Sequence, residues 1–154
     1  MPFVEIKNSG YNSRKQMMNL INYVISEERH IINSMTGGRM ILTGTPQCVY
    51  DQMMAVKKQY KQVDGQFMRH IIISPSDDES LYINTHSLYM IAMRICEFFP
   101  EHQSVVAIHQ ETERPHIHIA INTVSFMDGK KIRIYLPKLI DCIQKIFDEY
   151  VPAL

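Results

Sequence analysis

The spacing of apolar and polar residues changes along the chain, and it predicts where helices and strands lie. Residues 3–7 alternate and predict a first strand. Residues 14–26 predict a helix, for which Ser13 is a suitable N-cap. The apolar stripe of that helix follows the i, i+3, i+4, i+7, i+8 spacing of a buried face and comprises Met17, Leu20, Ile21, Val24 and Ile25.

The segment after this helix contains residues that favour turns. Its glycines and Pro46 predict that residues 27–47 are mainly loop, with one strand at 39–43. Further along, the patterns predict helices at 49–62, 86–99 and 137–150 and strands at 67–74, 104–109 and 116–122. Helices thus alternate with strands, and the last two strands form a hairpin. The expected fold class is α+β, with a largely antiparallel central sheet and helices packed on it.

The composition is that of one globular domain. The 154 residues are 45% hydrophobic and 21% charged, which suffices for one buried core. No apolar run reaches ~18 residues, and the N-terminus does not have the pattern of a signal peptide, so no membrane insertion is expected. The three cysteines are widely spaced without a CxxC pair, which favours a reducing cytoplasm over a disulfide framework.

Basic and acidic residues balance, at sixteen each. Non-specific coating of nucleic acid needs many phosphate contacts, so this balance disfavours that class of protein. It is compatible with a site-specific DNA enzyme, because local basic patches can steer a charged substrate. The candidate patches, each equally compatible with plain surface charge, are Arg14–Lys15, Lys57–Lys58–Lys61 and Lys130–Lys131–Arg133.

The predicted strand 116–122 has two different faces. Side chains alternate along a strand, so its three isoleucines share one face and suit a core against helices. The opposite face carries polar chemistry and comprises His116, His118, Ala120 and Asn122.

A hairpin between strands 104–109 and 116–122 would bring three histidines together. Placing His109 opposite His116 places Ala107 opposite His118, which leaves space around the imidazoles. Three neutral imidazoles on a rigid hairpin can bind one divalent metal and leave positions open for substrate. The sequence therefore predicts a metal site at His109, His116 and His118.

Two acids lie in the loop between these strands. Glu111 and Glu113 could accept a hydrogen bond from an imidazole N–H and so fix its tautomer. Each is equally well explained as an exposed loop acid.

Tyr23 is the candidate nucleophile that would narrow the chemistry. On a helical wheel it lies roughly 130° from the centre of the apolar stripe, where a core tyrosine would not lie. Periodicity alone favours a partly exposed tyrosine without a catalytic role.

Three motifs resemble those of the MOBP relaxases of conjugative plasmids and integrative elements, within the HUH nucleases. In the family's order they are LINYVISEE at 20–28, HIIIS at 70–74 and PEHQSVVAIHQETERPHIHIAIN at 100–122. The likeness covers most of residues 1–125, and the third motif is the most specific. It departs from the family where Glu111 and Glu113 replace frequent aspartates and where Arg29–His30 replaces a frequent Lys-Thr pair.

The resemblance implies strand-specific DNA nicking and joining at an origin of transfer. Tyr23 falls at the family's nucleophilic tyrosine, which would give a 5′-phosphotyrosyl intermediate. Ser74 falls at a serine associated with DNA handling near the nick, and Asn122 at an asparagine that follows the metal histidines. The general base stays open between Glu111, Glu113 and the field of the metal.

The implied partners are single-stranded origin DNA and accessory DNA-binding and coupling proteins. Candidate backbone contacts are Arg14, Lys15, Lys130 and Lys131. Imidazole ligands favour Mn, Co, Ni, Cu or Zn by affinity, whereas phosphate oxygens and cellular supply favour Mg or Mn as the working ion. Because relaxases are usually longer, residues 1–154 are interpreted as a catalytic domain and a candidate N-terminal part of a longer protein.

Three other interpretations use the same histidines. A rolling-circle replication initiator usually has its tyrosine after the histidine motif, whereas Tyr23 precedes it. A small-molecule phosphoesterase would need no covalent tyrosine. A DNA-binding accessory protein with structural zinc would need a fourth ligand, which the sequence does not make evident.

Overall fold

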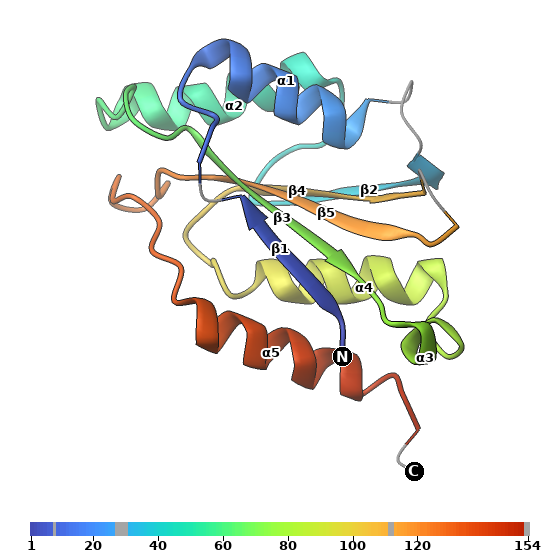
Figure 1. Ribbon diagram of the computed structural model, residues 1–154. Coiled ribbons are helices and arrows are strands. Elements are labelled where there is room, and N and C mark those ends of the chain that lie inside the picture. Colours follow the sequence, from blue (N-terminus) through green and yellow to red (C-terminus); the bar gives the residue numbers. More distant parts are fainter. Residues whose placement is uncertain (8, 27–30, 111–112, 153–154) are drawn as a thin grey trace.

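The computed structural model describes residues 1–7, 9–26, 31–110 and 113–152, with the backbone alone at 31–34. Five strands form one sheet in the order β1-β3-β5-β4-β2, and all their pairings are antiparallel (Figure 1). This confirms the predicted α+β class. The elements are β1 (Phe3–Lys7), α1 (Arg14–Ile25), β2 (Ile31–Arg39), α2 (Pro46–Gln59), β3 (Met68–Ser74), α3 (Asp77–Ser80), α4 (Thr85–Cys96), β4 (Ser104–His109), β5 (His116–Asn122) and α5 (Leu136–Asp148).

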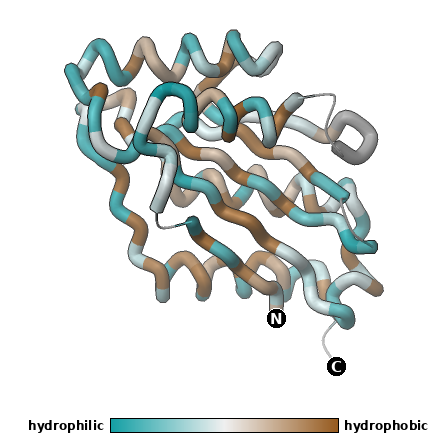
Figure 2. Tube along the Cα trace, turned by 45° about the horizontal axis from the view of Figure 1, so that its top comes forward, coloured by the Kyte–Doolittle hydropathy of each residue, from teal (hydrophilic) through white to brown (hydrophobic). Residues whose placement is uncertain are grey.

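Helices cover both faces of the sheet. Helices α1 and α2 lie on one side, and α4 and α5 lie on the other (Figure 1). In Figure 2 hydrophobic residues recur along the strands and along the helices that cover them. Successive side chains of a strand point to opposite faces of the sheet, so each strand contributes to both layers. The β5 isoleucines pack in the core under α4 and α5, whereas Ala107 and Ala120 pack beneath α1 and α2. The histidine face of the hairpin therefore also packs under helices, except at His116, which is only partly buried.

Helix α1 forms as its sequence pattern predicts. The Ser13 side chain accepts a hydrogen bond from the Gln16 N–H, and all five residues of the predicted apolar stripe are buried. Helix α2 begins earlier than predicted because Thr45 caps it and Pro46 occupies its first turn, where no N–H donor is needed.

The segment 27–47, predicted to be mainly loop, contains strand β2 at Ile31–Arg39. The strand predicted at 39–43 is wrong, because β2 ends at Arg39 and residues 40–43 form no strand. Gly37 and Gly38 had indicated a turn, but in the sheet they permit close packing. A Cβ at Gly37 would overlap the Tyr89 side chain on α4, and one at Gly38 would crowd the Ser104 carbonyl. The glycines thus fit the edge strand against its neighbours.

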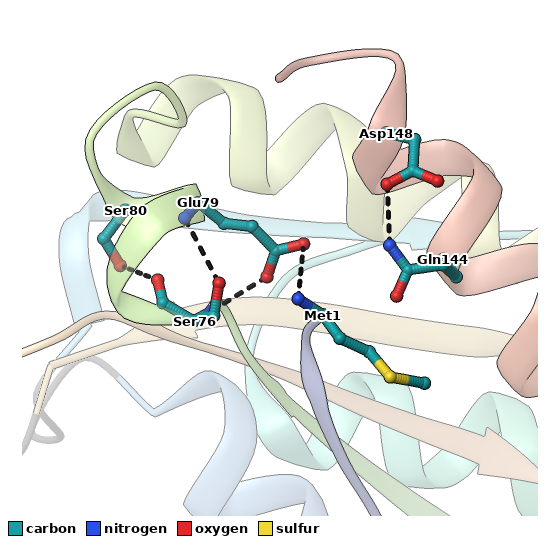
Figure 3. A network of polar contacts seen from close by, with 6 residues as sticks. All are labelled: Met1, Ser76, Glu79, Ser80, Gln144 and Asp148. Carbon is teal, nitrogen blue, oxygen red and sulfur yellow. Dashed lines mark hydrogen bonds and ion pairs between the residues drawn. The ribbon is translucent and has the colours of Figure 1, made fainter. Parts of the chain in front are cut away.

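The short helix α3 is a further element that the pattern did not reveal. Ser76 and Glu79 form a capping box at its start, and the amino group of Met1 lies 3.7 Å from the Glu79 carboxylate (Figure 3). Among the described residues, no helix has both the length and the apolarity required to cross a membrane.

Candidate active site

The β4–β5 hairpin has the register that the sequence predicts. His109 lies opposite His116, and Ala107 lies opposite His118. Directly opposed residues of an antiparallel pair share a face, so the three histidines lie on the α1 side of the sheet. Histidines separated by six residues in the sequence are therefore neighbours in the fold.

Tyr23 lies among imidazole rings. Its ring centroid is 5.3 Å from that of His109 and 5.3 Å from that of His118, with edge-on geometry in both pairs. The His109 and His118 centroids are 4.3 Å apart, and both side chains are buried. Tyr23 projects from the side of α1, off its apolar stripe, and is partly buried over the histidines. Helical periodicity alone favoured a Tyr23 without a catalytic role, yet in the structure Tyr23 lies next to the candidate metal ligands.

His70 on β3 is a member of this cluster that sequence reasoning missed. Its Nε2 lies 3.0 Å from Nδ1 of His118, and its Nδ1 lies 3.0 Å from the Tyr11 hydroxyl. A usable signal was present, because His70 and Ser74 are four residues apart on one strand and therefore share a face. The motif HIIIS had drawn attention to Ser74 alone.

Ser74 lies beside the third predicted ligand. Its hydroxyl oxygen is 3.1 Å from Nδ1 of His116, and both side chains are only partly buried. The structure thus brings Ser74 to the exposed end of the histidine group.

Burial sets the protonation of the inner histidines. Desolvation, reinforced by His109, His70 and His116, lowers the pKa of His118 to about 2. Desolvation, with Lys7 as the next largest cause, lowers the pKa of His70 to about 4. Both rings are therefore neutral near pH 7, and neutral imidazole is the form that binds a metal.

The donor chemistry of the three predicted ligands fits a divalent metal. Each ring has one nitrogen engaged from outside the trio. His109 Nε2 donates to the Val24 carbonyl at 2.7 Å, His70 engages His118, and Ser74 engages His116. Outer partners of this kind orient metal-binding imidazoles in proteins.

The ligand geometry itself is not preformed. Within the ranges that the structure describes, no three His, Cys, Asp or Glu side chains are arranged to hold a metal ion.

Asn122 does not have the environment predicted for it. Its amide is fully buried, accepting a hydrogen bond from Lys57 and donating to Gln103 and to the Met53 carbonyl. It therefore lines no DNA-accessible surface in this structure. The strand alternation that put Asn122 on the histidine face was correct, but α2 covers that end of the face.

The charged residues singled out from the sequence are distributed over the molecule. Arg14 and Lys15 are exposed in the first turn of α1, and Glu113 is exposed just before β5. Glu111 lies outside the described residues. Lys131 pairs with Val124 beyond the far end of β5, and Lys130 adjoins it, so neither is near the histidines.

The structure thus places Tyr23 of α1 over the histidines of the β4–β5 hairpin in an α+β domain. The family model described as relaxase, MobA/VirD2-like, nuclease domain, matches residues 11–151, and the chain belongs to this family. No curated protein matches the chain.

Solved structures show the same fold. A chain from a study of the molecular basis of vancomycin resistance transfer in Staphylococcus aureus has a TM-score of 0.66 and 12% identity, over 97% of this chain and 92% of that one. A manganese-bound MobM relaxase domain (MOBV; Mob_Pre) with plasmid pMV158 oriT DNA has a TM-score of 0.59 and 10% identity, over 99% and 88%. The MobM relaxase domain bound to a 26-nucleotide pMV158 oriT DNA has a TM-score of 0.58 and 11% identity, and the match covers 99% of this chain and 89% of that one.

Proposed function

We propose that this chain is the catalytic domain of a conjugative relaxase that nicks and rejoins one DNA strand at an origin of transfer, with Tyr23 as nucleophile. The observation that carries the proposal is the position of Tyr23, edge-on to His109 and His118 at 5.3 Å. Membership of the relaxase nuclease family supports it, as do the MobM structural neighbours, which are bound to oriT DNA.

In the proposed step, the Tyr23 hydroxyl oxygen attacks the scissile phosphorus in line with the 3′ oxygen. The new bond joins Tyr23 to the 5′ phosphate, and the bond from phosphorus to the 3′ oxygen breaks. The phenolic proton passes to a base, and the departing 3′ oxygen takes up a proton. Because one phosphate ester replaces another, the reverse reaction rejoins the strand. Glu111 and Glu113, which follow β4 in the sequence, are the candidate proton acceptors, and activation of Tyr23 by the field of a bound metal is the alternative.

His109, His116 and His118 are the residues that would hold a divalent ion. When bound, the ion would supply positive charge to the non-bridging phosphate oxygens. We expect Mn²⁺ or Mg²⁺ in function, with Zn²⁺, Ni²⁺ or Co²⁺ as alternatives. The manganese in the MobM neighbour supports divalent-metal use.

A backbone contact links the nucleophile to this ligand set. His109 Nε2 donates to the carbonyl of Val24, the residue that follows Tyr23. This hydrogen bond joins β4 to α1 at the nucleophile, so the orientation of the His109 ring and the position of Tyr23 are coupled. We expect Tyr23 to be oriented before DNA binds, which lowers the entropic cost of reaching the attack geometry.

The proposed substrate is the single-stranded DNA around the nick. We propose that the protein acts on it in the cytoplasm, together with accessory DNA-binding and coupling proteins. Ser74, next to His116 at the exposed end of the histidine group, is proposed to contact the strand near the nick. A Ser74→Ala protein that folds and cleaves DNA at the wild-type rate would limit Ser74 to holding His116.

The test is covalent capture of DNA. The protein is mixed with Mn²⁺ and a pool of single-stranded oligonucleotides of randomised sequence, and adducts are separated on a denaturing gel. We expect adducts with the wild-type protein and none with Tyr23→Phe, because Phe removes only the hydroxyl oxygen. Tyr11→Phe is the matched control and should still form adduct. Peptide mapping that finds DNA on Tyr11, or a Tyr23→Phe protein that forms adduct at normal yield, would overturn the assignment.

A further inference from the structure

A cavity of about 590 Å³ opens next to the nucleophile. Tyr23, His70 and Tyr11 are among the residues that line it. Its volume falls within the range of about 300–1,000 Å³ of pockets that bind small molecules. The proposed chemistry at the scissile phosphate uses Tyr23 from this cavity, with His70 behind His118, and gives no role to the α1 side chains that precede Tyr23 or to Tyr11.

The α1 wall carries side chains that can distinguish one nucleobase from another. Gln16, Asn19 and Tyr23 follow the i, i+3, i+7 spacing, so they lie along one side of the helix, and all three line the cavity. A carboxamide offers a donor beside an acceptor, which matches the edge of a base. The Gln16 carbonyl oxygen already accepts a 2.6 Å hydrogen bond from the Asn12 N–H, so Asn19 is the side chain best suited to use both functions.

Tyr11 gives the cavity a rigid aromatic wall. Its backbone has φ 57°, a left-handed conformation that a bulky residue rarely adopts. Contacts at both ends hold it there. The Tyr11 carbonyl accepts a hydrogen bond from the Phe67 N–H at 2.8 Å, and its hydroxyl lies 3.0 Å from Nδ1 of His70. An immobilised ring of this kind is a platform on which an unstacked base can stack.

A basic side chain at the cavity, that of Lys7, suits the DNA phosphates that would accompany a base. Lys7 on β1 lines it and is held by an ion pair with Glu5, with 2.7 Å between Nζ and Oε1. An ammonium group at the edge of an aromatic and amide-lined pocket can contact a phosphate while the base enters. A free apolar ligand would make no use of this lysine.

We propose that this cavity binds one unstacked nucleobase of the DNA strand, adjacent to the phosphate that Tyr23 attacks, and that Asn19 reads the edge of that base. This inference rests on the proposed function, because only that function identifies the bound strand as the DNA that is nicked. Asn19 lies one helical turn before Tyr23, about 5–6 Å away along the helix surface. A phosphate and the base of its own or the neighbouring nucleotide are separated by a similar span. Asn19 therefore determines a sequence preference at one position flanking the nick.

The experiment sequences both products of covalent capture from the randomised single-stranded pool. For the wild-type protein we expect one preferred base at a position flanking the nick. Asn19→Ala should lose at least about tenfold of that preference, which corresponds to one hydrogen-bonded base edge. Preferences at other positions should remain. Asn22→Ala, an exposed asparagine on the same helix that does not line the cavity, is the matched control and should behave as wild type.

The inference is overturned if Asn19→Ala and the Gln16→Ala/Asn19→Ala double variant keep the wild-type preference at both flanking positions, or if the wild type shows none there. A second selection keeps this outcome separate from the proposed function. DNA retained in the presence of a chelator, without cleavage, is sequenced for the same variants. No adduct from any DNA, together with an Asn19-dependent base preference among retained strands, would refute nicking by this chain and support the pocket.

Discussion

At the scale of single residues, His70 joins two parts of the site that lie far apart in the sequence. It contacts Tyr11 through Nδ1 and His118 through Nε2, at 3.0 Å each. For His118 to offer Nε2 to a metal, its Nδ1–H donates to His70, and the Nδ1–H of His70 then donates to the Tyr11 oxygen. In the proposed metal site, His70 is therefore a positioning residue that selects the tautomer of His118 without binding the metal itself.

This role predicts a graded effect on metal binding. His116→Ala, like His109→Ala and His118→Ala, should abolish tight binding of Mn²⁺ or Zn²⁺ in calorimetry because the protein then has one ligand fewer. His70→Leu should weaken it by about 10–100-fold, the usual effect of removing an outer partner. His86→Ala, on the exposed side of α4, should bind as wild type. An unchanged affinity of the His116→Ala protein for the metal would show that His116 is not a ligand.

Residues differ in how well the sequence predicted them, for a physical reason. Alternation on β5 and the H-x6-H-x-H spacing fixed the hairpin register, which needs only local information. His70 comes from a strand whose neighbour β5 lies more than 40 residues later, and its role depends on that pairing. Asn122 was placed on the correct face, but the pattern could not indicate that Lys57 would reach it from α2.

At the scale of elements, one lysine ties helix α2 to the sheet. Lys57 is fully buried, and its ammonium group donates to the Phe67 carbonyl and to the Asn122 side-chain oxygen at 2.6 Å each. Burial, and next the charge of Lys131, lowers the pKa of Lys57 to about 7. The three oxygens around it favour the charged form, whereas desolvation opposes it, and desolvation is the larger effect.

The lowered pKa predicts how stability depends on pH. Between about pH 7 and the ordinary lysine value of 10.5, the unfolded chain binds a proton at Lys57 that the folded chain does not. The free energy of unfolding should therefore rise with pH across this window, by at most about 1.4 kcal/mol per pH unit from this group. Urea unfolding at several pH values should show a shallower rise in Lys57→Met than in wild type.

Lys58→Met is the control for this measurement, since Lys58 is exposed one residue further along the same helix. Its pH profile should parallel that of the wild-type protein. Lys57→Met should also be less stable at pH 7, by roughly 1–3 kcal/mol, because the Phe67 carbonyl and the Asn122 side-chain oxygen each lose their shortest hydrogen bond. Equal pH slopes in the Lys57→Met and Lys58→Met proteins would contradict the assignment.

The elements themselves were largely predictable where their pattern was local. Strands β4 and β5 have the predicted bounds, and α1 differs by one residue at its end. Strand β2 was missed because Gly37 and Gly38 act through contacts with Tyr89 and β4, which are formed only in the assembled sheet. Helix α3 is too short for periodicity to reveal it.

At the scale of the whole molecule, a group of basic residues lies at the opposite end of β5 from the candidate site. The site is at the start of β5, and Lys130 and Lys131 follow its other end, roughly 20 Å away at the ordinary rise of a strand. They border a cavity of about 780 Å³ together with Arg133. A strand of DNA that reaches both regions would contact these lysines through its phosphates, far from the reacting centre.

The Lys130→Gln/Lys131→Gln protein should therefore bind all single-stranded sequences more weakly. The slope of log affinity against log salt concentration should become shallower by about 0.7 for each phosphate that the variant no longer neutralises. Base preference at the nick should not change, and fluorescence anisotropy at several salt concentrations measures the slope. Lys138→Gln, an exposed lysine on α5, is the control. A double variant with the wild-type slope would show that the strand does not reach this end of the protein.

The strand order β1-β3-β5-β4-β2 has a consequence for the protein during its own synthesis. The two strands made first are the two outer strands, and the central ones are made last. A nascent chain that has completed α1 carries Tyr23 but neither strand of the histidine hairpin. On the proposed mechanism, nuclease activity therefore cannot arise until the ribosome has passed His118. Incomplete translation products would contain Tyr23 without its proposed metal ligands and could not cut the cell's own DNA.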